Sequence, residues 1–110
     1  MAIWNLGSIN IDHIYRLDHL PRPGETIASR DFSQGLGGKG ANQSIAAARA
    51  GAATMHLGAM GTGDGWVIAG LRDSGIGTEN ILRLSDQVTG HAIILLDQDA
   101  ENSIVIHPGA

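Results

Sequence analysis

The stretch SQGLGGKGANQSIAAARAG, residues 33–51, places the only lysine of the chain, Lys39, between glycines and directly before an alanine-rich run. Ala41 and Ile45 stand one helical turn apart, and Gly51 is a residue type that commonly follows the last turn of a helix. The pattern predicts a glycine-rich loop followed by a helix that begins near Lys39 and ends at Gly51. The small side chains of this helix would let it lie close to a sheet.

The composition fits one small domain or a piece of a larger one, with 110 residues, 43% hydrophobic and 16% charged. A net charge of −4 without any cluster of Lys or Arg argues against a nucleic-acid partner. The chain has no cysteine, which excludes disulfides and thiolate chemistry, and no apolar run near the roughly 20 residues of a membrane span. The N-terminal MAIWNLGSINID does not read as a secretory signal. We therefore expect a soluble, cytoplasmic α/β protein.

Strand and turn patterns alternate along the rest of the chain and include one further helix. The predicted elements are a strand over residues 3–11 that runs into the core, a PRPGET turn at 21–26, a returning strand over TIASRDF at 26–32, a buried strand at 53–61, a helix from an N-cap at Asp64 to a stop at Gly75, and a hairpin at 91–107. This order predicts an α/β core that carries a separate small sheet.

Two phosphate-binding motifs match the glycine-rich loop only in part. A Walker A loop needs Gly first and Ser or Thr last, but Ser33 and Gly40 occupy these places. GLGGKG at 35–40 fits the dinucleotide fingerprint G-x-G-x-x-G, yet residues 32–63 contain no Asp or Glu to bind the ribose of the cofactor. A plain flexible turn before a helix would explain the glycines but not Lys39.

A site for a neutral polyhydroxy ligand explains more of these residues. Lys39 and Asn42 are three residues apart, so both leave the first helical turn on one face, where free backbone N–H groups also point outward. Asn10 and Asp12 alternate along a strand and therefore project to one side. A carboxylate can accept hydrogen bonds from two adjacent hydroxyls, although Asp12 could instead cap the end of a strand.

Six stretches together resemble the ribokinase-like carbohydrate kinases, the PfkB family, and most closely the ribokinase branch. They are NLGSINID at 5–12, PRPGET at 21–26, GLGGKGANQSIAAARAGA at 35–52, LGAMG at 57–61, GIGTENI at 75–81, and TGHAIILLD through IHPGA at 89–110. The resemblance implies the N-terminal part of a three-layer α/β core, with a β-sheet lid built from segments at about 12–34 and 88–107.

The resemblance also implies a role for particular residues. The sugar hydroxyls would contact Asn10, Asp12, Gly38, Lys39 and Asn42, with Gly37 shaping the loop. Ala92 and Ile94, two residues apart on a lid strand, would form an apolar cover over the sugar. Two lids would pack together in a homodimer.

The implied activity is ATP- and Mg²⁺-dependent phosphorylation of a sugar, with ribose at its 5-hydroxyl as the expected substrate. The family's D-T-x-G-A-G-D motif, which holds the catalytic aspartate, does not occur in these 110 residues. GTGD at 61–64 lacks the preceding Asp-Thr, so we expect no catalytic residue here and no kinase activity of the chain alone.

Three other functions stay open at this point. The chain could belong to a fructokinase or related PfkB kinase, could be a non-catalytic sugar-binding or dimerising module, or could be an oxidoreductase that binds a dinucleotide at GLGGKG. The five histidines show no metal-ligand spacing, so we expect no metal site in this chain.

Overall fold

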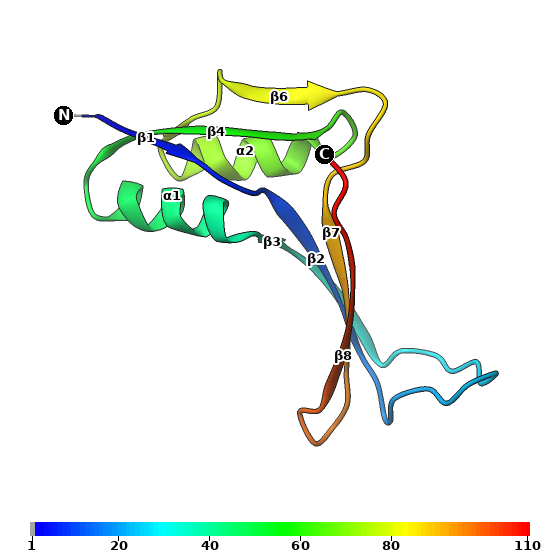
Figure 1. Cartoon of the computed structure of the whole chain (residues 1–110). Helices are drawn as coiled ribbons and strands as arrows, with labels where there is room; N and C mark the ends of the chain where they lie inside the picture. Colours follow the sequence, from blue (N-terminus) through cyan, green and yellow to red (C-terminus); the bar gives the residue numbers. More distant parts are fainter. Residues whose placement is uncertain (1) are drawn as a thin grey trace.

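The computed structural model describes residues 2–110, which form two four-stranded sheets and two helices (Figure 1). The core sheet consists of the parallel strands β1 (Ala2–Leu6), β4 (Ala53–Gly61), β5 (Ile76–Gly77) and β6 (Ile81–Leu84), in which β4 pairs with each of the other three. The outer sheet has the order β3 (Asp31–Gly37), β2 (Asn10–Arg16), β7 (His91–Leu96), β8 (Asn102–His107). This arrangement confirms the predicted α/β fold with a separate small sheet.

Helices α1 (Lys39–Arg49) and α2 (Gly65–Asp73) lie on the same side of β1 and β4 (Figure 1). The apolar core fills the space between these helices and the core sheet, and Met60 and Leu71 are fully buried there. The outer sheet projects away from this core, so the molecule is flat and extended, with principal dimensions of 52 × 33 × 18 Å.

Neither helix of residues 2–110 covers the opposite face of the core sheet (Figure 1). Asn5 and His56 are paired in register and both face α1, so their neighbours Trp4 and Leu6 point the other way. Trp4 is 61% exposed and Leu6 is 79% exposed. The chain thus supplies two layers of the three-layer arrangement that the resemblance implies.

The predicted first strand over residues 3–11 is wrong in one respect, because it is broken between Leu6 and Asn10. Its first half pairs with β4 in the core sheet, and its second half pairs with β3 and β7 in the outer sheet. The break lies at Gly7, where a Cβ atom would be 2.6 Å from the Cα of Gly40. The backbone of α1 passes so close to this turn that no side chain fits between them.

The returning strand also differs from its prediction. It occupies Asp31–Gly37 instead of residues 26–32, so Gly35 and Gly37 belong to a strand and not to a loop. Antiparallel pairing with β2 holds these glycines extended, with Asp12 opposite Gly35. The short strands β5 and β6 were not predicted, since neither has enough residues for a visible alternation.

Both helices and the C-terminal hairpin were predicted correctly. The residues Gly51 and Gly75, which follow the two helices, have φ angles of 96° and 84°, as expected for helix-ending glycines. Asp64 stands at the N-cap position of α2, but its side chain makes no capping hydrogen bond. The N-cap position was therefore predicted correctly, but the expected hydrogen bond from the helix N–H groups to the Asp64 side chain is not formed.

We predict that Gly40→Ala destabilises the chain by about 1–3 kcal/mol, because the added methyl group would overlap Gly7 and lie 2.5 Å from the backbone nitrogen of Ser8. The matched control is Gly70→Ala in α2, where a Cβ would meet no heavy atom within 4 Å. The control should stabilise the chain by about 0.5–1 kcal/mol through helix propensity. Urea unfolding measures both, and equal effects of the two substitutions would contradict the close crossing.

Candidate functional site

The predicted polar residues meet at the corner where the outer sheet joins the core. Asn10 begins β2 and lies opposite Gly37, the last residue of β3. The carboxylate of Asp12 lies directly over Gly37, since a Cβ at that glycine would be 2.7 Å from Oδ1 and 2.8 Å from Oδ2. Only a glycine leaves room there for the aspartate side chain. Because side chains alternate along β2, Asn10 and Asp12 lie on the same face of the sheet.

The start of α1 is fixed next to the same strand. Gly38 is the N-cap residue, with a φ of 94° that favours glycine, and a Cβ there would lie 2.8 Å from the carbonyl oxygen of Ser8. The backbone N–H of Ala41 donates to the same Ser8 carbonyl at 2.9 Å. These contacts hold the first turn of the helix against residues 8–10, so its positive end faces the corner.

Lys39 and Asn42 stand exposed on this first turn. Within residues 2–110 neither side chain makes a hydrogen bond or an ion pair. The backbone N–H of Asn42 donates to the Gly38 carbonyl at 3.1 Å, which keeps the turn regular. The corner thus presents a carboxylate, an ammonium and two amides whose side-chain groups are available to a ligand.

Ala92 and Ile94 lie on the face of the outer sheet that carries Asp12. The parallel register places Ala92 beside Asp12 and Ile94 beside Ile14. Ile106 lies across from Ala92 on β8 and extends the same apolar surface. The outer sheet therefore presents apolar side chains on the face of Asp12, and Ala92 and Ile94 share one face, as their spacing predicted.

The sequence reasoning missed Gly90, which is buried at the start of β7. A Cβ at this position would lie 2.6 Å from Oδ1 of Asn10. A second small residue therefore admits a polar side chain to the corner, as Gly37 does for Asp12. The only signal in the sequence was a glycine directly before a strand, which usually marks a turn.

The dinucleotide interpretation does not fit this topology. Its fingerprint needs a strand, a turn and a helix that belong to one parallel β-α-β unit. Here the strand before α1 is β3, which is antiparallel to β2 in the outer sheet, whereas the strand after α1 is β4 in the core sheet. The match of GLGGKG to G-x-G-x-x-G therefore comes from glycines that serve other contacts.

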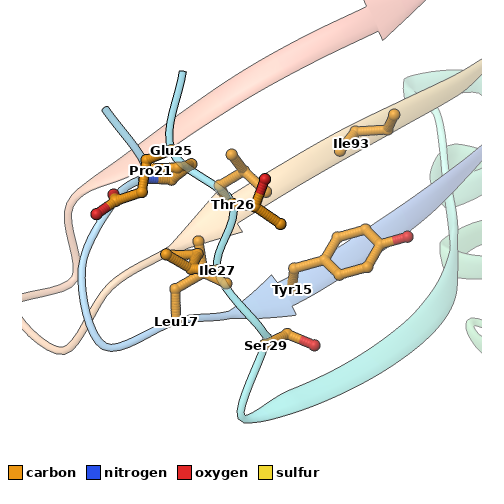
Figure 2. Close-up of a pocket in the computed structure, with 9 residues that line it drawn as sticks. Tyr15, Leu17, Pro21, Glu25, Thr26, Ile27, Ser29 and Ile93 are labelled. Atoms are coloured by element: carbon orange, nitrogen blue, oxygen red, sulfur yellow. The ribbon is translucent and has the colours of Figure 1, made fainter. Parts of the chain in front are cut away.

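A hollow on the opposite face of the outer sheet is separate from this corner (Figure 2). Tyr15 of β2, Leu17 directly after β2 and Ile93 of β7 form its floor, and the loop through Thr26 and Ile27 lies across it. The strand register explains the separation. Side chains alternate along β2 and β7, so Tyr15 and Ile93 lie on the face of the outer sheet opposite to Asp12. The hollow is mainly apolar and carries no convergent polar groups of the kind found at the corner.

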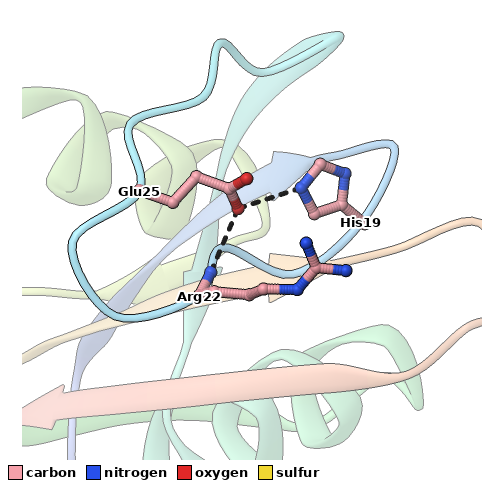
Figure 3. A network of polar contacts seen from close by, with 3 residues as sticks. All are labelled: His19, Arg22 and Glu25. Carbon is pink, nitrogen blue, oxygen red and sulfur yellow. Dashed lines mark hydrogen bonds and ion pairs between the residues drawn. The ribbon is translucent and has the colours of Figure 1, made fainter.

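A short polar network fixes the turn next to this hollow (Figure 3). Oε1 of Glu25 accepts hydrogen bonds from Nε2 of His19 at 2.9 Å and from the backbone N–H of Arg22 at 3.1 Å. The Arg22 bond, followed by the His19 bond, lowers the pKa of the Glu25 carboxyl. Glu25 thus closes the PRPGET turn locally.

Three imidazoles from three strands also lie together on this opposite face. The ring centroid of His91 is 5.6 Å from that of His13 and 5.3 Å from that of His107. No group of three or more His, Asp or Glu side chains between Ala2 and Ala110 has a geometry that could hold a metal ion. Sequence spacing could not reveal this row, because each histidine comes from a different strand.

Comparison with known proteins was made against a family model, curated sequences and solved structures. The model described as "pfkB family carbohydrate kinase" matches residues 3–110. The ribokinase of Haemophilus influenzae is 39% identical over 107 residues, which cover 96% of this chain and 35% of that protein.

Two solved ribokinases share the fold. The ribokinase of Cryptococcus neoformans in complex with ADP superposes with a TM-score of 0.91 at 46% identity, over 99% of this chain and 35% of that one. The Arabidopsis thaliana ribokinase complexed with ribose and ATP has a TM-score of 0.89 at 33% identity, over 99% and 36%.

The chain therefore spans about a third of the length of these relatives. None of the helices in the described part is long and apolar enough to cross a membrane. The family model matches nearly every residue of this chain, and ribokinases share both sequence and fold with the chain. The chain therefore belongs to the pfkB family of carbohydrate kinases, as its glycine-rich loop and strands predicted.

Proposed function

We propose that this chain is the sugar-binding part of an ATP-dependent sugar kinase of the ribokinase type, with the 5-hydroxyl of ribose as phosphoryl acceptor. One observation supports this proposal above the others. The carboxylate of Asp12 is seated over Gly37 at the corner where α1 begins, so an acceptor and a set of donors face the same space. The names of the similar proteins agree, since they are ribokinases and one was solved with ribose and ATP.

The roles of the site residues follow from their chemistry. Asp12 accepts hydrogen bonds from two neighbouring hydroxyls of the sugar, and Lys39 donates to a third oxygen. Asn10 and Asn42 can donate and accept, which suits hydroxyl groups that do both. Gly38 keeps the backbone amides at the helix start within reach of the ligand.

In this proposal the outer sheet is the lid of the sugar site. Ala92 and Ile94 cover the carbon face of the sugar, and they exclude water from the reacting hydroxyl. Exclusion of water strengthens the hydrogen bonds that hold the substrate. The segments at about 12–34 and 88–107 supply this lid.

Phosphoryl transfer needs a positioned nucleophile, neutralisation of the phosphate charge and a base for the attacking hydroxyl. Residues of this chain supply the positioning. ATP binding and the catalytic aspartate belong, in our proposal, to residues outside these 110. Mg²⁺ would neutralise phosphate charge in the complete enzyme, but no group of His, Asp or Glu among residues 2–110 fits a metal ion.

The alternative is a non-catalytic sugar-binding or dimerising module, which would bind the same sugar without phosphorylating it. A cytoplasmic location, supported by the lack of cysteine, is part of the leading proposal. The same corner would also serve a fructokinase, because ketose hydroxyls offer similar hydrogen bonds.

The lid is also the proposed surface for a homodimer. Its face opposite Asp12 exposes apolar side chains, with Phe32 47% exposed and Val105 65% exposed, beside the hollow of Figure 2. A second copy of the same sheet would cover these residues. Burial of such an apolar surface is the main driving force of obligate dimers.

Ribose should bind to the chain, and Asp12→Asn should weaken its binding about 10–100-fold, since hydrogen bonds to a charged group contribute about 1.5–3 kcal/mol. The control is Asp73→Asn, an exposed aspartate in α2. Titration calorimetry measures both dissociation constants. Unchanged binding by Asp12→Asn would contradict the assignment of the site.

The isolated chain should show no phosphorylation of ribose in a coupled assay of ADP release, because it contains no D-T-x-G-A-G-D motif. Turnover above that of a sample without protein would overturn this prediction. Turnover together with binding of ATP would place the catalytic residues among the 110.

Sedimentation of Val105→Lys should show a shift from dimer to monomer, since a charge would replace an apolar contact between two lids. The matched control is Ile104→Lys, the preceding residue in β8, which points to the Asp12 face and is 51% exposed. An equal shift for both variants, or no dimer of the unaltered chain, would argue against this interface.

A further inference from the structure

Two backbone segments cross in contact beneath the candidate site. Gly7 lies at the end of β1 and Gly40 in the first turn of α1, and their backbones touch without room for a side chain on either. One segment leads directly to Asn10, and the other begins with Lys39. The spacing at this crossing therefore sets the distance between the two halves of the corner.

A chain of buried polar groups surrounds the crossing. The side-chain amide of Asn5 donates to the carbonyl of Gly40 and to Oγ of Ser44, both at 2.9 Å. Oγ of Ser44 lies 2.7 Å from Nδ1 of His56, and Nε2 of His56 lies 3.0 Å from the carbonyl oxygen of Gly7. Both crossing glycines thus have their carbonyl groups held by side chains of one network.

Donors and acceptors in this network allow one arrangement of protons. A carbonyl oxygen only accepts, so Nε2 of His56 carries a hydrogen and donates to Gly7. Nδ1 of the neutral ring then accepts from the hydroxyl of Ser44, which in turn accepts from Asn5. His56 and Ser44 are both 0% exposed, and burial, partly offset by the Gly7 hydrogen bond, lowers the pKa of His56.

This network is more than a filler of the core. Apolar side chains could fill the same volume without the cost of burying polar groups. The polar groups instead connect β1, α1 and β4 beside the contact of Gly7 with Gly40, and every buried side-chain polar atom among residues 2–110 has a partner. A satisfied network of this kind specifies one geometry.

We propose that His56, through Ser44 and the Gly7 carbonyl, is a positioning residue that sets the approach of α1 to the β1–β2 turn. It thereby aligns Lys39 and Asn42 with Asp12. The link to sugar affinity rests on the proposed function, whereas the link to the geometry of the helix start does not. His56 itself touches no part of the candidate site.

His56→Phe tests this role, because it keeps the ring and removes the donor to Gly7. Ribose binding should weaken about tenfold, the cost of one misplaced or lost hydrogen bond. His56→Gln keeps one donor and one acceptor and should stay within about threefold of the unaltered chain. Asp73→Asn, at the exposed end of α2 and outside the lid segments, is the control and should leave the affinity unchanged.

Amide NMR spectra give a readout that does not need the sugar. His56→Phe should shift the backbone resonances of residues 38–42, and His56→Gln should leave them near their original positions. Unshifted resonances in the folded His56→Phe variant, with ribose affinity retained, would overturn the inference. No ribose binding by the unaltered chain, with these shifts present, would instead count against the proposed function alone.

A double variant covers the case in which His56→Phe does not fold. Ser44→Ala with His56→Phe also removes the buried Ser44 hydroxyl that His56→Phe alone would leave without its acceptor, so the double variant should lose less stability than His56→Phe. The double variant should fold, yet still bind ribose about tenfold more weakly with shifted 38–42 resonances. Recovery of affinity together with stability would show that His56 only fills the core.

Stability should also depend on the protonation of His56. The unfolded chain takes up this proton near the ordinary pKa of 6.5, whereas the folded pKa is lower, so stability falls as the pH drops through and below 6.5. The groups that face the ring, Asn5, Ser44 and the Gly7 carbonyl, do not titrate in this range. Urea midpoints at pH 7.5 and 5.5 should differ more for the unaltered chain than for His56→Gln, and equal differences would contradict the buried neutral ring.

Discussion

The contact between the backbones of Gly7 and Gly40 is the constraint on which the rest of this structure depends. It lies where the first strand breaks, with β1 in the core sheet before it and β2 in the outer sheet after it. It also fixes where α1 begins, with Ala41 bonded to the Ser8 carbonyl. A side chain on either glycine would separate the strand from the helix, and the polar corner would lose its shape.

The corner combines an exact fit of small residues with an open polar surface. Gly37 and Gly90 leave space for the side chains of Asp12 and Asn10 against the backbone. Lys39 and Asn42 instead remain exposed to solvent. In the proposed sugar site, Asp12 and Asn10 would therefore orient the ligand at little entropic cost, because their positions are already fixed against the backbone.

The sequence predicted the elements that have strong local signals. The spacing of Ala41 and Ile45 marked α1, and two β-forming runs around a polar turn marked the β7–β8 hairpin. The strand break at Gly7 could not be predicted, because the two halves pair with different distant strands and Gly7 itself contacts Gly40, more than thirty residues away along the chain. Local patterns carry no information on such a crossing.

The site was predictable to a similar degree. Alternation correctly placed Ala92 and Ile94 on one face of a strand, since period two survives any choice of partner strand, whereas the register of β2 with β7 decides that this is the face of Asp12. The Ser44–His56 pair was not foreseen, because it joins a helix to a strand across the core and neither residue type is unusual in its segment. Interactions between elements, and not within them, account for what was missed.

The parallel pairing of β2 with β7 has a consequence for the order in which the chain can fold. Ile11 is in register with His91, so this pairing closes a loop of about eighty residues, whereas β2 and β3 can pair as soon as both have left the ribosome. During synthesis one side of β2 must wait with open backbone hydrogen-bonding groups until β7 emerges. That interval exposes the nascent chain to mispairing with other extended segments.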